Sequence, residues 1–461
     1  MVVRRVGDRF VAAALAAATI ALGATRAGDT SFWLDEAYTA AVVRQSFGGL
    51  ARLLGHEAGM GPYYLTLWAW ERLGDSEWSL RMLSVTGGAL AVAALYLLAA
   101  RFIDRRVAAV ACVAVVCNPI FLYDLTELRA YSWAMCSVVV STTLFLRLRA
   151  EPNRRRAVMY GASVGGALAL VVFSAGVVLA QLCFTGPLIT ERARRRLLLI
   201  AGAVAAVLLG PFVPALLTSR QIDWIPHTTM HRLNMQSAVA FGSSNWRACF
   251  AIGLVLLTLS LVQRRRRGEA DIALEVILAS VVATIGLLLG VSLIRPVFVA
   301  RYLAGVFPLT ALGATAGYLR AGDALVTRLR TGHDLRVAVP WILAALSLAG
   351  MRGPLFTDSE RPEDLRAPGQ FLTKFVRPDQ AVVFDTAQQA TAFSYYWTPR
   401  PGVLVAEHVA ATGLPCRVWW VVRGHGDALD PVVSAAPADA TVAVYDFVGY
   451  TIGDIDGCRV G

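Results

Sequence analysis

The stretch ALAVAALYLLAARFIDRRVAAVACVAVV, residues 89–116, places a short arginine cluster between two long apolar runs. An apolar run of about 20 residues is long enough to cross the hydrocarbon core of a bilayer as a helix. Arginine clusters in the loops between such helices concentrate on the cytoplasmic side of the membrane. This alternation therefore predicts a membrane protein in which residues 101–106 form a cytoplasmic turn.

The composition of the whole chain agrees with this interpretation. Of its 461 residues, 56% are hydrophobic and only 16% are charged, whereas soluble globular proteins carry about 25% charged residues. The formal net charge of +11 could indicate nucleic-acid binding. However, the positive charges are almost all arginines in short clusters between apolar runs, which is the pattern that orients a membrane protein. We therefore expect membrane lipid as a partner, and no nucleic acid.

A window of about 20 residues finds the same alternation along most of the chain. The expected spans lie near residues 10–26, 82–100, 107–122, 131–147, 157–173, 175–190, 197–217, 248–263, 272–294, 302–319 and 337–351. If every arginine cluster is cytoplasmic, about eleven helices result, with the N-terminus inside and the C-terminus outside. The first span could instead be a cleaved signal peptide. A tight turn at FSAG, residues 173–176, separates the fifth span from the sixth.

The last part of the chain, residues 352–461, has a different pattern. The strand-like runs AVVFD, GVLVA, RVWWVV and TVAVYDF alternate there with helical or loop segments. This alternation is typical of a small α/β domain. The sequence thus predicts a polytopic α-helical membrane domain over residues 1–351, with a first outer loop at about 27–81, and an extracytoplasmic α/β domain over 352–461. Cys416 and Cys458 lie in this domain, where a disulfide can persist, although the sequence alone does not show that they pair.

Ionisable residues gather at the turns that are expected outside the membrane. The stretch SFWLDEAYTA, residues 31–40, carries Asp35 and Glu36, and YDLTELRAYSW, residues 123–133, carries Glu127 and Arg129. Charged groups at the membrane boundary are costly, so they indicate a functional site by default. A transporter would place such groups near the middle of the membrane in repeated halves, and the expected spans have no central carboxylate. The pattern favours an external active site for a lipid-linked phosphosugar over a transporter or flippase.

Four stretches resemble the GT-C superfamily of integral-membrane glycosyltransferases, in the branch of the protein O-mannosyltransferases and aminoarabinose transferases. They are WLDEAYTA, HEAGMGPYYLTLWAWERLGDSEWSLRMLSV (56–85), YDLTELRAYSW and ARYLAGVFPLTAL (300–312), and they occur in the family's order. The resemblance covers most of the chain and is strongest over residues 31–135. It implies an inverting transfer of a sugar from a polyprenyl-phosphate donor to a glycan, lipoglycan or protein outside the cytoplasm. We expect the protein in the plasma membrane of a bacterium.

The resemblance also implies roles for particular residues. Asp35 takes the role of the base that deprotonates the acceptor, with Glu36 in support. Arg129 and Arg301 are the candidates for holding the donor phosphate. The further candidates for substrate binding are Glu127, Tyr131, His56, Tyr63 and Tyr64. Mannose is the expected sugar, with arabinose or another pentose as the alternative. No particular cofactor is indicated, and a divalent cation would be compatible.

Several of these residues also have structural interpretations. Asp35 and Glu36 could simply cap a helix, and Glu127 and Arg129 could fasten two helix ends. Tyr63 and Tyr64 could belong to a belt of aromatic residues at the membrane interface. A membrane scaffold without catalytic activity, whose C-terminal domain binds a partner, is a further alternative. For that alternative, replacing Asp35 would leave function unchanged.

Overall fold

The computed structural model describes two compact units. The described residues are 2–56, 59–218, 225–329, 363–398, 402–406, 417–424, 426–434 and 440–456. The first unit, called the helical unit here, comprises Met1–Thr25, Ala51–Thr66 and Arg81–Asp358. The second, called the sheet unit, comprises Arg26–Leu50, Leu67–Leu80 and Ser359–Gly461.

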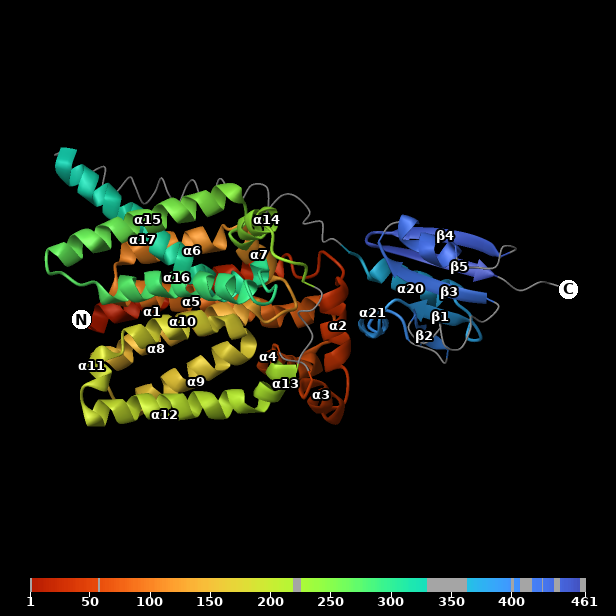
Figure 1. The fold of residues 1–461 in the computed structure, drawn as a ribbon, viewed down its shortest axis with the longest axis horizontal. Coiled ribbons are helices and arrows are strands. Elements are labelled where there is room, and N and C mark those ends of the chain that lie inside the picture. The colour runs from red at the N-terminus through yellow and green to blue at the C-terminus, as the bar shows by residue number, and fades with distance from the viewer. Residues whose placement is uncertain are drawn as a thin grey trace. The chain divides into compact units, whose positions relative to one another are not determined.

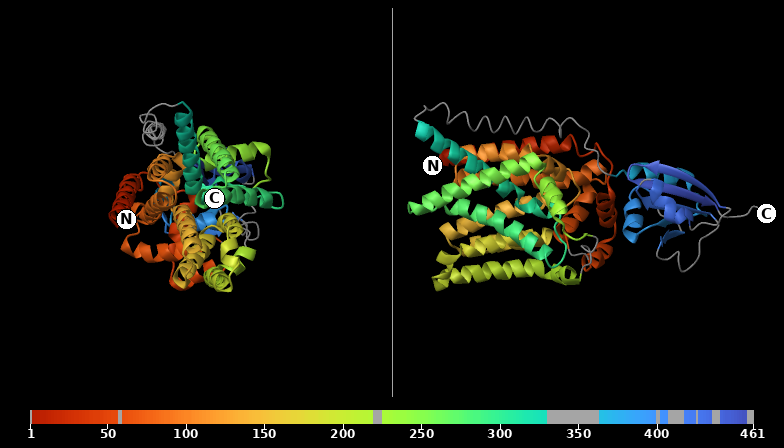
Figure 2. Two further views of the ribbon diagram at one scale, coloured as in Figure 1. Left: turned by 90° about the vertical axis from the view of Figure 1, so that its left-hand side faces the viewer. Right: turned by 45° about the horizontal axis from the view of Figure 1, so that its top comes forward.

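The helical unit is built from long helices that run side by side (Figures 1 and 2). The helices of this part of the chain are α1 Val2–Ala24, α3 Phe47–Leu54, α4 Gly61–Trp70, α5 Glu77–Phe102, α6 Arg105–Val116, α7 Pro119–Leu125, α8 Tyr131–Ala150, α9 Arg154–Leu170, α10 Ala175–Cys183, α11 Gly186–Ile189, α12 Arg192–Leu209, α13 Val213–Thr218, α14 Met230–Ala240, α15 Ser244–Arg266, α16 Ile272–Ser292 and α17 Phe307–Leu329. Of these, α3, α4 and α5 contribute residues to both units.

The helices confirm a multi-pass membrane protein. Within the described residues, seven helices are long and apolar enough to cross a membrane, or eight if the bent pair α6 and α7, which meet at 70°, forms one span. The predicted tight turn at FSAG is present, because α9 ends at Leu170 and α10 begins at Ala175 after one 3-10 turn. The expected span at 337–351 lies outside the described residues, so the total of about eleven stays a prediction.

Helix ends in the helical unit are fixed by side-chain caps beside the arginine clusters. The Asp104 carboxylate accepts a hydrogen bond from the backbone N–H of Arg106 at 2.7 Å, which caps α6. The Asn153 side chain caps α9 in the same way, at 2.9 Å from the N–H of Arg156. Caps of this kind satisfy backbone donors that have no partner inside the helix. They explain why the chain turns sharply at each of these clusters.

Small residues allow pairs of helices to approach closely. A Cβ atom added to Gly317 of α17 would lie 1.9 Å from the carbonyl oxygen of Gly253 on α15. A Cβ atom on Gly161 of α9 would lie 2.2 Å from the carbonyl oxygen of Ala201 on α12. Close backbone approach through glycine is a common way to pack helices in membranes. These two contacts therefore define where α15–α17 and α9–α12 pack.

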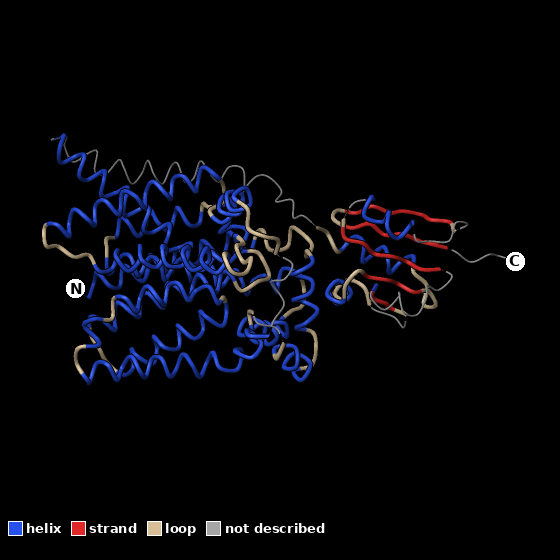
Figure 3. Tube along the Cα trace, in the orientation of Figure 1, coloured by secondary structure: helices blue, strands red, loops and turns tan. Residues whose placement is uncertain are grey.

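The sheet unit contains a five-stranded mixed sheet (Figure 3). Its strands are β1 Ala381–Phe384, β2 Val403–Val405, β3 Arg417–Arg423, β4 Thr441–Phe447 and β5 Tyr450–Asp456, in the order β2-β1-β3-β5-β4. The first three pair in parallel, whereas β5 pairs antiparallel with both β3 and β4. The four strand-like runs predicted from the sequence are confirmed. The sequence pattern does not predict the fifth strand, β5.

Helices from both ends of the sequence belong to the sheet unit. The C-terminal part supplies α20 Arg366–Phe375, α21 Ala387–Phe393 and the short α23 Asp430–Ser434, while α2 Leu34–Val43 comes from the first outer loop. Helix α2 packs against α21. The sequence-based boundary at residues 351 and 352 stays a prediction, but this compact unit includes parts of the first outer loop as well as the C-terminal segment.

Candidate active site

The two adjacent carboxylates differ in their environment. Asp35 and Glu36 lie in the first turn of α2, where the preceding Trp33 is extended. Successive side chains on a helix point about 100° apart, so the neighbours face different surroundings. Glu36 is fully buried. Asp35 is half-buried, and its carboxylate accepts a hydrogen bond of 3.3 Å from the side-chain amide of Gln388 in α21.

The backbone leading into α2 is held by side chains from the C-terminal part of the sheet unit. The N–H of Phe32 donates to the hydroxyl of Tyr396 at 2.8 Å, and the N–H of Leu34 donates to Glu363 at 3.1 Å. The first N–H groups of a helix have no partner within it, so such bonds stabilise its start. The position of Asp35 and Glu36 thus depends on residues more than 300 positions away.

Two carboxylates, the buried Glu363 and the half-buried Glu77, organise these contacts. Glu363 also accepts hydrogen bonds from Arg423 Nε at 2.7 Å and from the Tyr450 hydroxyl at 3.3 Å. Glu77 accepts hydrogen bonds from Arg366 and from the Tyr396 hydroxyl. Burial, and the nearby Glu363 or Glu77 charge, raise the pKa of both tyrosines above the usual range, so their hydroxyls remain protonated donors.

Arg44, at the end of α2, connects the two loop segments of the sheet unit. Its guanidinium pairs with Asp75 at 2.9 Å and lies 4.0 Å from the centre of the Tyr395 ring. The Tyr395 hydroxyl in turn donates to the carbonyl oxygen of Asp75 at 2.7 Å. Residues 26–50, residues 67–80 and the turn after α21 are therefore joined by one set of contacts.

Asp385, directly after β1, is a further half-buried carboxylate in this unit. It accepts hydrogen bonds of 3.4 Å from the Trp420 indole and from the backbone N–H of Arg423. Burial raises the pKa of Asp385 despite these two bonds. Asp385 could not be selected from the sequence, because a single Asp after a strand carries little signal.

The second group of candidate residues lies in the helical unit, at the turn between α7 and α8. Glu127 and Tyr131 are buried, together with Asp124, while Arg129 is half-buried. The Tyr63 hydroxyl is hydrogen-bonded to the hydroxyl of Ser84 at 2.8 Å, and Ser84 donates to the carbonyl oxygen of Arg129 at 3.2 Å. The structure thus connects Tyr63 with this turn through Ser84, a residue that no sequence motif singles out.

The remaining candidates are distributed over other elements of the helical unit. Arg301 is half-buried in the 3-10 helix η4, Ala300–Val306. His56 is exposed. Tyr63 and Tyr64 are both only 2% exposed, so the expectation that they belong to an interfacial aromatic belt is wrong. They pack inside the unit because α4 is covered by its neighbours, including Phe212, which lies against Gly61.

Two further expectations concern the pairing of two cysteines and the binding of a divalent cation. Cys416 and Cys458 lie outside the described residues. Among the residues that are described, no group of three or more His, Cys, Asp and Glu side chains is placed to hold a metal ion.

Solved structures with the same architecture define the class of fold. The ArnT protein of Cupriavidus metallidurans, solved with bound undecaprenyl phosphate, matches with a TM-score of 0.61 and 14% sequence identity, over 98% of each chain. The oligosaccharyltransferase of Archaeoglobus fulgidus, solved with zinc and sulfate, matches with a TM-score of 0.59 and 11% identity, over 90% of this chain and 67% of that one. The protein therefore has the fold of the GT-C membrane glycosyltransferases, and the resemblance predicted from its sequence is confirmed.

Part of the chain also matches the model of a particular protein family. Residues 58–217 match the model of the dolichyl-phosphate-mannose-protein mannosyltransferase family. No curated protein matches the chain by sequence. The matched region includes α5 to α12 and the turn that carries Glu127 and Arg129.

Proposed function

We propose that this protein transfers a mannosyl group from a polyprenyl-phosphate donor to an acceptor outside the cytoplasm, at the plasma membrane. The acceptor is a glycan, lipoglycan or protein. Two similarities support the donor class: the family model that matches residues 58–217 is named for dolichyl-phosphate mannose, and the ArnT structure holds undecaprenyl phosphate. Both compounds are polyprenyl phosphates.

The proposed reaction needs one base and a phosphate site. The oxygen of the acceptor hydroxyl attacks C1 of the sugar, the bond between C1 and the phosphate oxygen breaks, and the hydroxyl proton passes to the base. The polyprenyl phosphate leaves as a stable anion, so that no general acid is required. A single displacement of this kind inverts the configuration at C1.

The assignment of the base rests on the difference in exposure between the two adjacent carboxylates. A general base must reach a proton of the substrate, and Asp35 is the partly exposed member of the pair whereas Glu36 is fully buried. We therefore assign proton removal to Asp35. Glu36 then acts from the interior, by fixing the first turn of α2.

The phosphate-binding role is assigned to two arginines of the helical unit. Arg129 and Arg301 are both half-buried, and a planar guanidinium can donate two parallel hydrogen bonds to a phosphate. The bonds from Tyr63 through Ser84 to the Arg129 carbonyl give Tyr63 a positioning role. Glu127, Tyr131, Tyr64 and His56 remain proposed contributors to substrate binding.

A transfer assay with purified protein tests this function. Radiolabelled mannose on a synthetic polyprenyl phosphate should reach a lipoglycan or peptide acceptor, and Asp35→Asn should reduce the rate by about 10²- to 10⁴-fold. Asp29→Asn is a matched control, because Asp29 is an exposed acid in the same loop. Full activity of Asp35→Asn would refute the base assignment. A preference for a donor carrying arabinose would identify arabinose, not mannose, as the transferred sugar. Failure to consume any donor would refute the proposal that the protein is a glycosyltransferase.

A further inference from the structure

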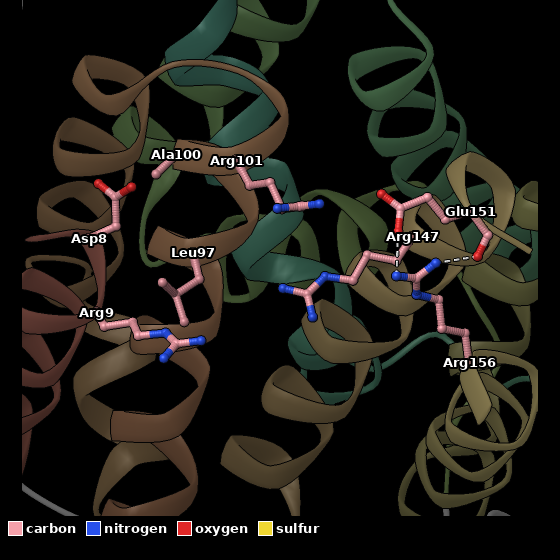
Figure 4. Close-up of a pocket in the computed structure, with 8 residues that line it drawn as sticks. All are labelled: Asp8, Arg9, Leu97, Ala100, Arg101, Arg147, Glu151 and Arg156. Carbon is pink, nitrogen blue, oxygen red and sulfur yellow. Dashed lines mark hydrogen bonds and ion pairs between the residues drawn. The ribbon is translucent and has the colours of Figure 1, made fainter. Parts of the chain in front are cut away.

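A cavity lined by arginines lies in the helical unit, and none of its lining residues is among those assigned to transfer. It has a volume of about 320 Å³ and is formed where α1, α5, α8 and α9 meet (Figure 4). Its lining residues are Asp8, Arg9, Leu97, Ala100, Arg101, Arg147, Glu151 and Arg156. They come from the start of α1, the end of α5, the end of α8 and the start of α9, so the cavity is at the end of the unit that carries the arginine clusters.

The charges of the cavity do not cancel. Four arginines and two carboxylates line it, a formal excess of two positive charges. Both carboxylates are already engaged, since Asp8 pairs with Arg105 at 2.7 Å and Glu151 pairs with Arg156. Figure 4 shows the guanidinium groups of Arg9, Arg101 and Arg147 pointing from three helices into the space between them. In the described part of the chain, neither Arg9 nor Arg101 forms an ion pair.

This arrangement matches the chemistry of a phosphate group. Guanidinium groups donate planar pairs of hydrogen bonds that fit phosphate oxygens, and several of them together neutralise its charge. The cavity is also at the lower end of the usual size of a small-molecule site, about 300 to 1,000 Å³.

The apolar side of the cavity distinguishes a lipid phosphate from a free one. Leu97 lies one helical turn before Arg101 on α5, and Leu90, seven residues before Leu97, is on the same face. Leu90 is 44% exposed, so an apolar track leads from the arginines along a helix long enough to cross the membrane. A phospholipid with its phosphate among the arginines could place an acyl chain along this track.

We propose that this cavity binds the phosphate of an anionic membrane phospholipid. Basic pockets between membrane helices at the cytoplasmic side bind lipid headgroups in other proteins, and the arginine-bearing end is the expected cytoplasmic end here. This binding is separate from sugar transfer, because none of the lining residues belongs to the proposed catalytic set.

Lipid binding by the purified full-length protein in neutral detergent tests this proposal. Fluorescent phosphatidylglycerol should bind about tenfold more tightly than phosphatidylcholine, and the double variant R9Q/R101Q should lose about that factor. The control R266Q/R267Q removes two exposed arginines from the end of α15 and should bind like wild type. If the double variant does not fold, Arg101→Gln alone, with its exposed side chain, makes the same comparison.

Three outcomes would overturn the proposal. An equal loss in the control would show that general surface charge attracts the lipid. Unchanged binding by R9Q/R101Q would place the lipid elsewhere. Displacement of phosphatidylglycerol by millimolar inorganic phosphate, with no preference for the lipid, would identify a site for free phosphate.

Discussion

The backbone N–H of Leu34 donates a hydrogen bond to the carboxylate of Glu363, which lies 329 residues later in the chain and is only 5% exposed. The same carboxylate accepts a bond from Arg423. Glu363 therefore stabilises both the start of α2 and the C-terminal sheet, and its loss should affect the two together.

Glu363→Ala should lower the free energy of unfolding of the sheet unit by about 2 kcal/mol, since it leaves buried donors without an acceptor. Glu363→Gln should cost less, because its amide oxygen can still accept. Tryptophan fluorescence during denaturant unfolding of the purified protein measures both. Asp379→Asn, at an exposed acid of the same unit, is the control; equal stability of Glu363→Ala and this control would contradict the role of Glu363.

Substitutions at the two adjacent carboxylates should separate activity from stability. Asp35→Asn should keep the thermal unfolding midpoint of wild type while losing transfer. Glu36→Gln should lower the midpoint, because it changes the hydrogen-bonding groups of a fully buried side chain and costs about 1 to 3 kcal/mol. Thermal unfolding measured together with the transfer assay tests this difference. If Asp35→Asn lowered the midpoint and Glu36→Gln lost only transfer, Glu36 would be the base and Asp35 the stabilising residue.

Replacing Asp385 should change how the stability of the protein depends on pH. Burial raises the pKa of Asp385 above its ordinary value of 3.8, so the folded protein binds this proton more tightly than the unfolded chain does. The stability that this provides is present at low pH and is lost as the pH rises through the folded pKa. Asp385→Asn should therefore gain stability relative to wild type as the pH rises above the ordinary value. Urea unfolding at several pH values measures this, and a constant difference would argue against it.

The contact between α15 and α17 should not tolerate a side chain at Gly317. Gly317→Ala would bring a Cβ atom to 1.9 Å from the Gly253 carbonyl oxygen, and overpacking of this kind costs about 1 to 3 kcal/mol. Gly286→Ala on α16 is the matched control, since the position of its Cβ is open. Thermal unfolding in detergent should distinguish the two variants; similar midpoints would mean that the helices separate easily.

The orientation in the membrane can be tested with a reporter enzyme that is active only outside the cytoplasm. A fusion after residue 352 should be active, because the C-terminal segment is expected outside. A fusion in the turn after α15, at Gly268, should be inactive, because that turn follows four consecutive arginines. An inactive fusion after residue 352 would contradict the predicted orientation.

The elements of the fold were largely predictable because hydrophobic pattern decides them. Long apolar runs become helices in a membrane, and the runs of β-branched and aromatic residues became β1 to β4. The strand β5 was missed because YTIGDID contains Gly453, Asp454 and Asp456, which are poor strand formers. Strand β5 is extended because it lies between β3 and β4 in the sheet and pairs with both. The tight turn at Gly449, whose φ is 81°, brings it back alongside β4.

The candidate site was only partly predictable. Motif resemblance identified Asp35, Glu36 and the turn at Glu127, because these residues carry chemistry that is recognisable in a short stretch. The dependence of α2 on Glu363 and Tyr396 could not be deduced, since no local pattern relates residues so far apart in the chain. The burial of Tyr63 and Tyr64 was missed for the same reason, because the neighbours that cover a helix are determined by tertiary packing.

The bond between Leu34 and Glu363 has a consequence for the order of biosynthesis. Residue 34 leaves the ribosome 329 residues before its partner, a delay of about 20 to 60 s at a synthesis rate of about 5 to 20 residues per second. During this time, α2 has none of its contacts with Glu363, Gln388 or Tyr396. The segment with the proposed base can therefore reach its final form only after residue 396 has been made, so that a chain terminated before this residue would insert helices into the membrane without a complete sheet unit.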